Sequence, residues 1–87
     1  MNLHVLKIKD NYYSEIFKKN KLFELRKDDR GYKVNDLIHF VKVDGTPFAN
    51  EPNNLYQITY LLKDVKEYGL MDGYAILSIK RIDYENI

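Results

Sequence analysis

Hydrophobic and polar residues alternate along several short stretches of the chain, and this period of two is typical of half-buried β-strands. The first such stretch is residues 3–9, in which His4, Leu6 and Ile8 share one face. We expect Leu6 and Ile8 to point into the core, and His4 to have a structural role near the end of the strand. The same pattern predicts further strands at residues 22–26, 37–43, 55–63 and 73–82.

For two of these strands the sequence also predicts the position in the sheet or the face on which side chains lie. Residues 37–43 are fairly apolar on both faces, so this strand should be central in its sheet. In the strand at residues 55–63, strict alternation places four side chains on one face, namely Tyr56, Ile58, Tyr60 and Leu62.

One short segment has helical spacing instead. Tyr12, Tyr13, Ile16 and Phe17 recur at intervals of one helical turn, which predicts an amphipathic helix after the first strand. Asp10 or Asn11 is the candidate for its N-cap, and the helix should end near residues 19–20. We expect Asn20 to end it in a left-handed conformation.

The remaining segments carry turn residues. Tight turns are predicted at Gly31, at Asn35 and at Asp44-Gly45, and one helical turn or an irregular crossing at residues 64–73. Residues 48–54 should form a loop, and the tail at 83–87 should be frayed. Five strands and one early helix predict a single α+β, mostly β domain over residues 1–87. A small barrel of five to six strands would remove the exposed sheet edges.

The amino-acid composition limits the chemistry and the cellular location expected of this domain. There is no cysteine, so neither disulfides nor thiolate chemistry are available. The first residues are interrupted by charge too early for a signal peptide, and no apolar run is long enough to cross a membrane. We therefore expect a cytoplasmic protein without a membrane partner.

Charge is spread unevenly along the chain. The formal net charge is only +1, which gives no strong signature of non-specific duplex binding. Residues 18–33 nevertheless carry an excess of four positive charges, so the rest of the chain is net acidic by three. A polyanion should therefore approach the chain at residues 18–33.

This basic segment contains the motif K-x-x-E-x-R, formed by Lys21, Glu24 and Arg26. In a strand, Phe23 and Leu25 would enter the core, while Leu22, Glu24 and Arg26 would share the other face. A carboxylate beside a guanidinium can fix that planar group for bidentate contact with a phosphate or a base edge. The alternative is an ordinary surface ion pair.

Other chemistry has little support in the sequence. The two histidines, His4 and His39, lie on different strands, and no carboxylate cluster has the spacing of metal ligands, so we expect no metal and no cofactor. If the protein is an enzyme, Lys21 is the candidate base and Glu24 would orient it or shuttle a proton.

Several ordered motifs together resemble the ASCH domains of the PUA-like superfamily. They resemble in particular a small bacterial and phage branch of unknown function that carries an R-K-N-D-R segment. The residues that carry this resemblance are His4-x-Leu6-Lys7-Ile8, Lys21-x-x-Glu24-x-Arg26, Arg26-Lys27-Asp28-Asp29-Arg30, Gly31-Tyr32-x-Val34-x-Asp36, Ile58-Thr59-Tyr60 and Tyr68-Gly69-Leu70-Met71-Asp72-Gly73-Tyr74. Two glycines of the family pattern are replaced, one by Lys19 and the other by Asn35.

The resemblance implies a PUA-like β-barrel whose cleft, between the helix and the signature strand, binds RNA or a modified nucleoside. Lys21, Glu24 and Arg26 correspond to the signature residues. Related small ASCH proteins are amidohydrolases that act on N4-acetylcytidine, but Glu24 stands where those proteins have a threonine.

We therefore prefer an RNA-binding or nucleoside-binding module to its two alternatives, a nucleoside amidohydrolase and a protein-interaction domain. The expected nucleic-acid-binding residues are Lys7, Tyr12, Lys21, Glu24, Arg26, Arg30 and Tyr60.

Overall fold

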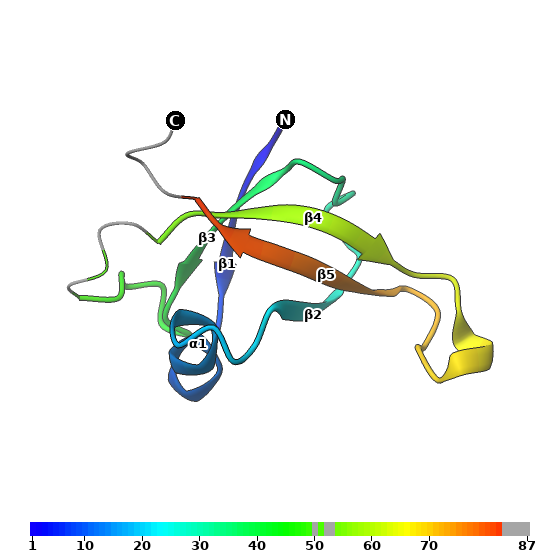
Figure 1. Cartoon of the computed structure of the whole chain (residues 1–87), viewed down its shortest axis with the longest axis horizontal. Coiled ribbons are helices and arrows are strands. Elements are labelled where there is room, and N and C mark those ends of the chain that lie inside the picture. Colours follow the sequence, from blue (N-terminus) through cyan, green and yellow to red (C-terminus); the bar gives the residue numbers. More distant parts are fainter. Residues whose placement is uncertain (50, 52–53, 83–87) are drawn as a thin grey trace.

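The computed structural model of the chain describes residues 1–49, 51 and 54–82. It contains one α-helix, α1 (Asp10–Phe17), and a short 3₁₀ helix, η1 (Lys66–Tyr68). One sheet has the strand order β1-β3-β4-β5-β2 and curls into a half-barrel (Figure 1). Its strands are β1 (Leu3–Lys7), β2 (Phe23–Lys27), β3 (Leu37–Val41), β4 (Tyr56–Leu62) and β5 (Tyr74–Arg81). The expected α+β, mostly β class is confirmed, with five strands in the described residues. The predicted tail at 83–87 lies outside them.

The sheet buries alternate side chains on its inner face. Leu6, Ile38, Phe40, Ile58 and Leu77 are fully buried and form the centre of the core. β3 lies between β1, to which it is parallel, and β4, to which it is antiparallel, as its apolar faces predicted.

Helix α1 packs on this core through Tyr13 and Ile16, the two buried residues of its apolar stripe. The ring of Tyr13 stacks on Phe48 with centroids 4.1 Å apart. The predicted caps of the helix are wrong. Its N-cap is Lys9, which makes no side-chain capping bond, and the left-handed residue that ends the turn is Lys19, with φ 65°. The left-handed residue therefore comes one position earlier than predicted, and the helix itself ends at Phe17, before the predicted end near residues 19–20.

The prediction for β4 fails halfway along the strand. Tyr56 and Ile58 are buried as expected, but a β-bulge interrupts the pairing with β5 between Ile58 and Tyr60. An extra residue in one strand reverses the alternation beyond it. Tyr60 is consequently 61% exposed on the outer face, and Leu61 packs on the core instead.

Side chains bridge the gap between the two edge strands, β1 and β2. The Arg26 guanidinium donates from Nη1 to the Lys7 carbonyl at 2.9 Å, and Arg30 donates from Nη1 to the Val5 carbonyl at 3.1 Å. Unpaired edge carbonyls are a liability for a sheet, and here they accept bonds from arginine side chains. We call this gap, with its two arginine bridges, the seam.

A buried hydrogen-bonded pair, His4 and Asp36, fixes the start of β1 to the turn before β3. His4 Nε2 lies 2.9 Å from Asp36 Oδ2, and the Asp36 carboxylate also accepts bonds from the backbone N–H groups of Asn2 and Lys33. Asn35, beside it, has the positive φ of 79° that the sequence predicted for a turn. His4 therefore has the structural role that was expected of it.

We expect this pair to make the fold sensitive to acid. Burial on its own raises the pKa of Asp36, but the hydrogen bonds from His4, Asn2 and Lys33 outweigh it and lower the pKa below its ordinary value of 3.8. Because the pKa of Asp36 is lower in the folded state, the ionised carboxylate stabilises the fold at pH values above its ordinary pKa. That stabilisation is lost as the pH falls through the folded-state pKa. Urea unfolding followed from pH 6 to pH 2 should show this loss.

The variant Asp36→Asn should remove this contribution and reduce the free energy of unfolding at pH 7 by roughly 1–3 kcal/mol. The matched control is Asp72→Asn, because Asp72 is exposed and only 3.8 Å from Lys66 Nζ in a weak ion pair. Equal stability of the two variants at pH 7 would contradict the assigned role of Asp36.

Candidate functional site

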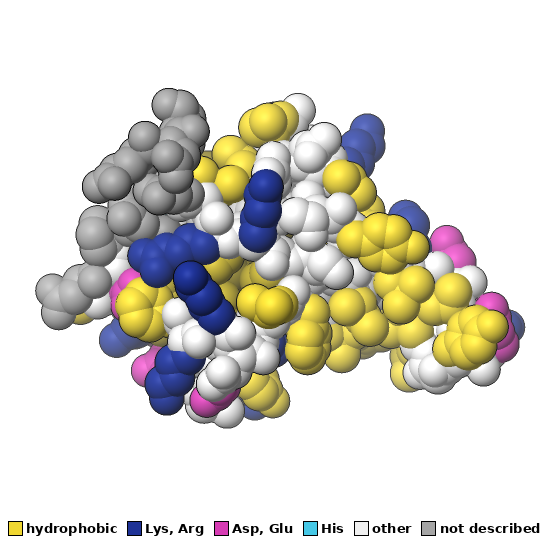
Figure 2. Space-filling model, viewed as in Figure 1, with side chains coloured by type: hydrophobic (Ala, Val, Ile, Leu, Met, Phe, Trp, Pro, Cys, Tyr) yellow, Lys and Arg dark blue, Asp and Glu magenta, His cyan; other side chains and the backbone are white. Residues whose placement is uncertain are grey.

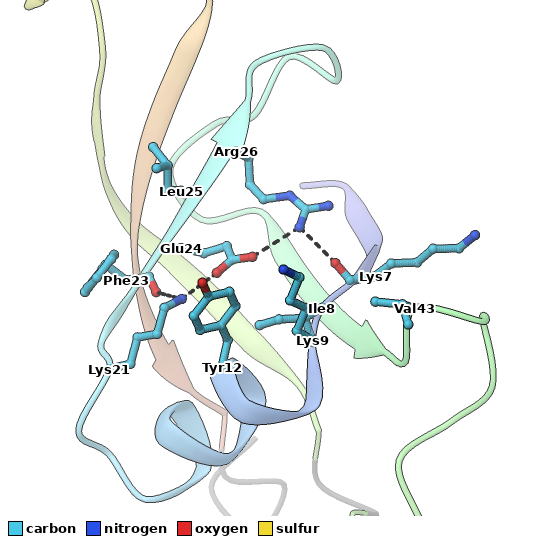
Figure 3. Close-up of a pocket in the computed structure, with 10 residues that line it drawn as sticks. All are labelled: Lys7, Ile8, Lys9, Tyr12, Lys21, Phe23, Glu24, Leu25, Arg26 and Val43. Atoms are coloured by element: carbon cyan, nitrogen blue, oxygen red, sulfur yellow. Dashed lines mark hydrogen bonds and ion pairs between the residues drawn. The ribbon is translucent and has the colours of Figure 1, made fainter. Parts of the chain in front are cut away.

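A cleft of about 510 Å³ opens along the seam beside α1. Its wall comes from the end of β1, from the first turn of α1, from the connection into β2 and from β2 itself (Figure 3). We call this cavity the seam cleft. Ligand pockets commonly have volumes of roughly 300–1,000 Å³ and mostly apolar walls with a few polar groups. The lining residues fit that description: Lys7, Ile8, Lys9, Tyr12, Lys21, Phe23, Glu24, Leu25, Arg26 and Val43.

Glu24 is the polar centre of the seam cleft. It is only 5% exposed, and each of its carboxylate oxygens has a cationic partner. Lys21 Nζ lies 2.6 Å from Oε1, and Arg26 Nη1 lies 3.1 Å from Oε2 (Figure 3). We refer to these three residues as the triad. It is neither a surface pair nor an isolated buried charge, because both carboxylate oxygens are hydrogen-bonded.

The triad reverses the predicted orientation of β2. The sequence placed Phe23 and Leu25 in the core, but they are 46% and 53% exposed, and Glu24 points inward. A carboxylate on the inner face of a sheet would normally be less favourable than a phenylalanine or leucine, because burial of an unpaired charge costs free energy. It is tolerated here because two cations satisfy it, and the register of β2 with β5 fixes the resulting alternation, with Glu24 opposite the buried Leu77.

The position of Lys21 depends on the way the chain leaves α1. After the left-handed Lys19, the N–H groups of Asn20 and Lys21 both donate to the Glu15 carbonyl, at 2.9 and 3.1 Å. Two residues later the Leu22 carbonyl accepts a bond from the N–H of Ile79 in β5. The connection is thus fixed at both ends, and Lys21 is held at the mouth of the seam cleft.

The ammonium group of Lys21 has one donor to spare. It donates to the Phe23 carbonyl at 2.8 Å and to Glu24, and a lysine ammonium has three N–H donors. The ring centroids of Phe23 and Tyr12 lie 4.8 and 5.7 Å from Nζ, within cation–π range. A cation, two partly exposed rings and one spare donor therefore occur together at this mouth.

The structure brings together five of the seven predicted binding residues, namely Lys7, Tyr12, Lys21, Glu24 and Arg26. Figure 3 shows the Lys7 side chain extending away from the triad. Arg30 bridges the seam at Val5 and is not part of the cleft wall, and Tyr60 lies on the outer face opposite Ser78 of β5. Both residues therefore lie outside the seam cleft, and their predicted binding role remains a prediction. Arg30 is engaged with β1, and the bulge in β4 turns Tyr60 outward.

Sequence reasoning missed Phe23 as a lining residue, because alternation had assigned it to the core. The signal that could have identified it is its place inside the K-x-x-E-x-R motif, between Lys21 and Glu24.

Arg26 and Arg30 also influence Tyr32, which is buried beside them. Burial raises the pKa of Tyr32, and the neighbouring Arg26 and Arg30 act in the opposite direction.

The described residues contain no group of three or more His, Cys, Asp or Glu side chains that could hold a metal ion. None of their helices is both long enough and apolar enough to cross a membrane.

The chain was compared with models of protein families and with curated proteins. The model of a family described as a domain of unknown function, DUF3850, matches residues 3–79. The match includes β1, α1, the triad and most of β5, so it covers every residue of the seam cleft. No curated protein matched the chain.

We expect Glu24→Gln to reduce the free energy of unfolding by roughly 1–3 kcal/mol, because Lys21 and Arg26 would lose their shared anionic acceptor in a mostly buried setting. The effect should appear as a lower urea midpoint with an unchanged slope. Glu67→Gln, at an exposed position in η1, is the matched control and should change stability by no more than about 0.5 kcal/mol. A Glu24→Gln protein as stable as the parent would contradict the structural role of the triad.

Proposed function

Since this chain belongs to the DUF3850 family of domains of unknown function, we propose its function from the seam cleft: it binds RNA or a modified nucleoside there. The observation that carries the proposal is the combination at the mouth of the cleft. Lys21 has a spare N–H donor and lies between the partly exposed rings of Tyr12 and Phe23. Unpaired bases are recognised in this way, by stacking on aromatic rings and by hydrogen bonds to their edges.

The charge distribution supports an anionic partner. Residues 18–33 carry the local positive excess of the chain, and they include the connection that forms one wall of the seam cleft. Within the triad, Glu24 has both oxygens occupied, so Lys21 supplies the available contact. Arg26 has a different role from the one predicted from sequence. It holds Glu24 and the Lys7 carbonyl, so it supports the cleft wall and contributes less to direct contact with a phosphate.

The backbone supports the resemblance to ASCH domains of the PUA-like superfamily. The chain departs from that pattern at two glycines, replaced by Lys19 and Asn35. Both residues have positive φ, 65° and 79°, which is the conformation in which glycine is favoured. The curled five-stranded sheet with a helix after β1 is also compatible with a PUA-like barrel.

The geometry favours binding over amidohydrolysis. A lysine that acts as a base must have a neutral amine with a lone pair directed at the reacting proton. In this cleft Nζ donates to a carboxylate and to a carbonyl, so it is placed as a donor. We further propose that the protein acts in the cytoplasm.

We expect Lys21→Met and Tyr12→Leu each to weaken binding at least about tenfold, because each removes one of the contacts that a base or phosphate would make. The measurement is a chemical-shift titration of labelled protein with short single-stranded RNAs, then with cytidine and N4-acetylcytidine. Shifts should cluster at Tyr12, Lys21 and Phe23. Tyr68→Leu is the matched control, because Tyr68 is highly exposed on η1 and far from the cleft lining.

The titration also separates the alternatives. A silent seam cleft with every probe would rule out the nucleic-acid proposal and favour a protein partner. Release of acetate from N4-acetylcytidine, abolished by Lys21→Met, would identify an amidohydrolase instead of a binding module.

A further inference from the structure

A second cleft of about 320 Å³ lies on the other side of the connection between α1 and β2. Its apolar floor includes Ile16 and Phe17 of α1 and Ile79 of β5. Figure 2 shows a group of lysine and arginine side chains on this face, between α1 and the end of β5. We call this second cavity the basic cleft.

Four cationic residues line the basic cleft: Lys19, Lys21, Lys80 and Arg81. Its lining contains no Asp or Glu, so the described wall has a single sign of charge. The Arg81 guanidinium also lies over the Phe17 ring, 5.2 Å from its centroid. Converging cations above an apolar floor concentrate anions and strengthen their hydrogen bonds.

Lys19 supports a ligand role independently of its charge. It follows α1 with a φ of 65°, a conformation in which glycine is favoured. A lysine in this conformation costs free energy that glycine would avoid. Such strain tends to occur at functional sites, and here it places a long cationic side chain in the wall of the basic cleft.

Tyr56 belongs to the wall of the basic cleft as a buried residue. Its hydroxyl lies beneath the surface, close to the equally buried hydroxyl of Tyr13. Tyr56 therefore supplies apolar ring surface to the wall, and the cationic side chains supply the polar contacts.

Lys21 lies in the wall of both clefts, so the two sites adjoin at this residue. We propose that the basic cleft binds the phosphate group of the ligand whose base occupies the seam cleft. This inference rests on the proposed function and makes it more specific, since the preferred ligand is then a nucleotide or a short single strand and not a free nucleoside. Lys21, with its one spare donor, would lie where the base and phosphate parts of that ligand meet, and Lys19 and Lys80 would contact the phosphate alone.

The test compares each of the four common ribonucleosides with its 3′- and 5′-monophosphates in the same chemical-shift titration. At least one monophosphate should bind about three- to tenfold more tightly than its nucleoside, and should also shift Lys19 and Lys80. The gain should shrink as salt is raised from 50 to 500 mM, because exposed cations are screened.

Two variants and one control make the comparison specific. Lys19→Gly keeps the left-handed backbone without strain, and Lys80→Ala truncates an exposed lysine in β5. Both should remove most of the gain from the phosphate while leaving nucleoside affinity within about twofold of the parent. Lys66→Ala, at an exposed position in η1, should change neither affinity.

The outcomes separate this inference from the proposed function. Equal affinity for nucleosides and monophosphates at the seam cleft would overturn the phosphate site and leave the proposed function intact. Inorganic phosphate that shifts Lys19 and Lys80, with no response of the seam cleft to any nucleoside, would support the phosphate site and overturn the proposed function. No response at either cleft would overturn both the phosphate site and the proposed function.

Discussion

The carboxylate of Glu24 is the interaction on which the rest of the cleft depends. Through Lys21 it holds the connection that follows α1, and through Arg26 it reaches the edge of β1, because the same guanidinium nitrogen also donates to the Lys7 carbonyl. One buried anion thus helps to join the segment from Lys21 to Arg26 to the edge of β1, which is distant from it in sequence. Such an arrangement stabilises a fold only when every partner is present, since removal of one leaves an uncompensated charge. The same contacts leave Lys21 with a single donor to offer, so they also limit the chemistry available at the mouth of the cleft.

Much of the fold follows from local signals in the sequence. Alternation located all five strands, and Gly31, Asn35 and Gly45 have the positive φ angles that their turns require. The failures arise where a distant contact overrides a local preference. Glu24 points inward because two cations satisfy it, and Tyr60 points outward because a bulge changes the phase of β4. The partner of His4 is Asp36, 32 positions away, and no periodicity indicates such a pair.

The candidate site was predictable in part for the same reason. A single motif supplied Lys21, Glu24 and Arg26, so their proximity followed from spacing alone. The motif could not reveal that Arg26 would be used to bridge the seam, because that contact needs the carbonyl of Lys7 on another strand. Nor could it reveal the basic cleft, whose cations come from two regions nearly 60 positions apart. The strain at Lys19 could not be predicted either. A left-handed lysine costs about 1 kcal/mol, and this is visible only once its φ is known.

The way the half-barrel is bridged affects how its cleft can change. In a barrel closed by a continuous ladder, strand number and stagger set the diameter. Across this seam, the spacing between β1 and β2 is instead maintained by the reach and rotamers of Arg26 and Arg30. The opening can therefore be widened or narrowed by changing two side chains, while every strand keeps its register. Related chains could acquire pockets of different width by single substitutions, without paying the cost of rebuilding the sheet.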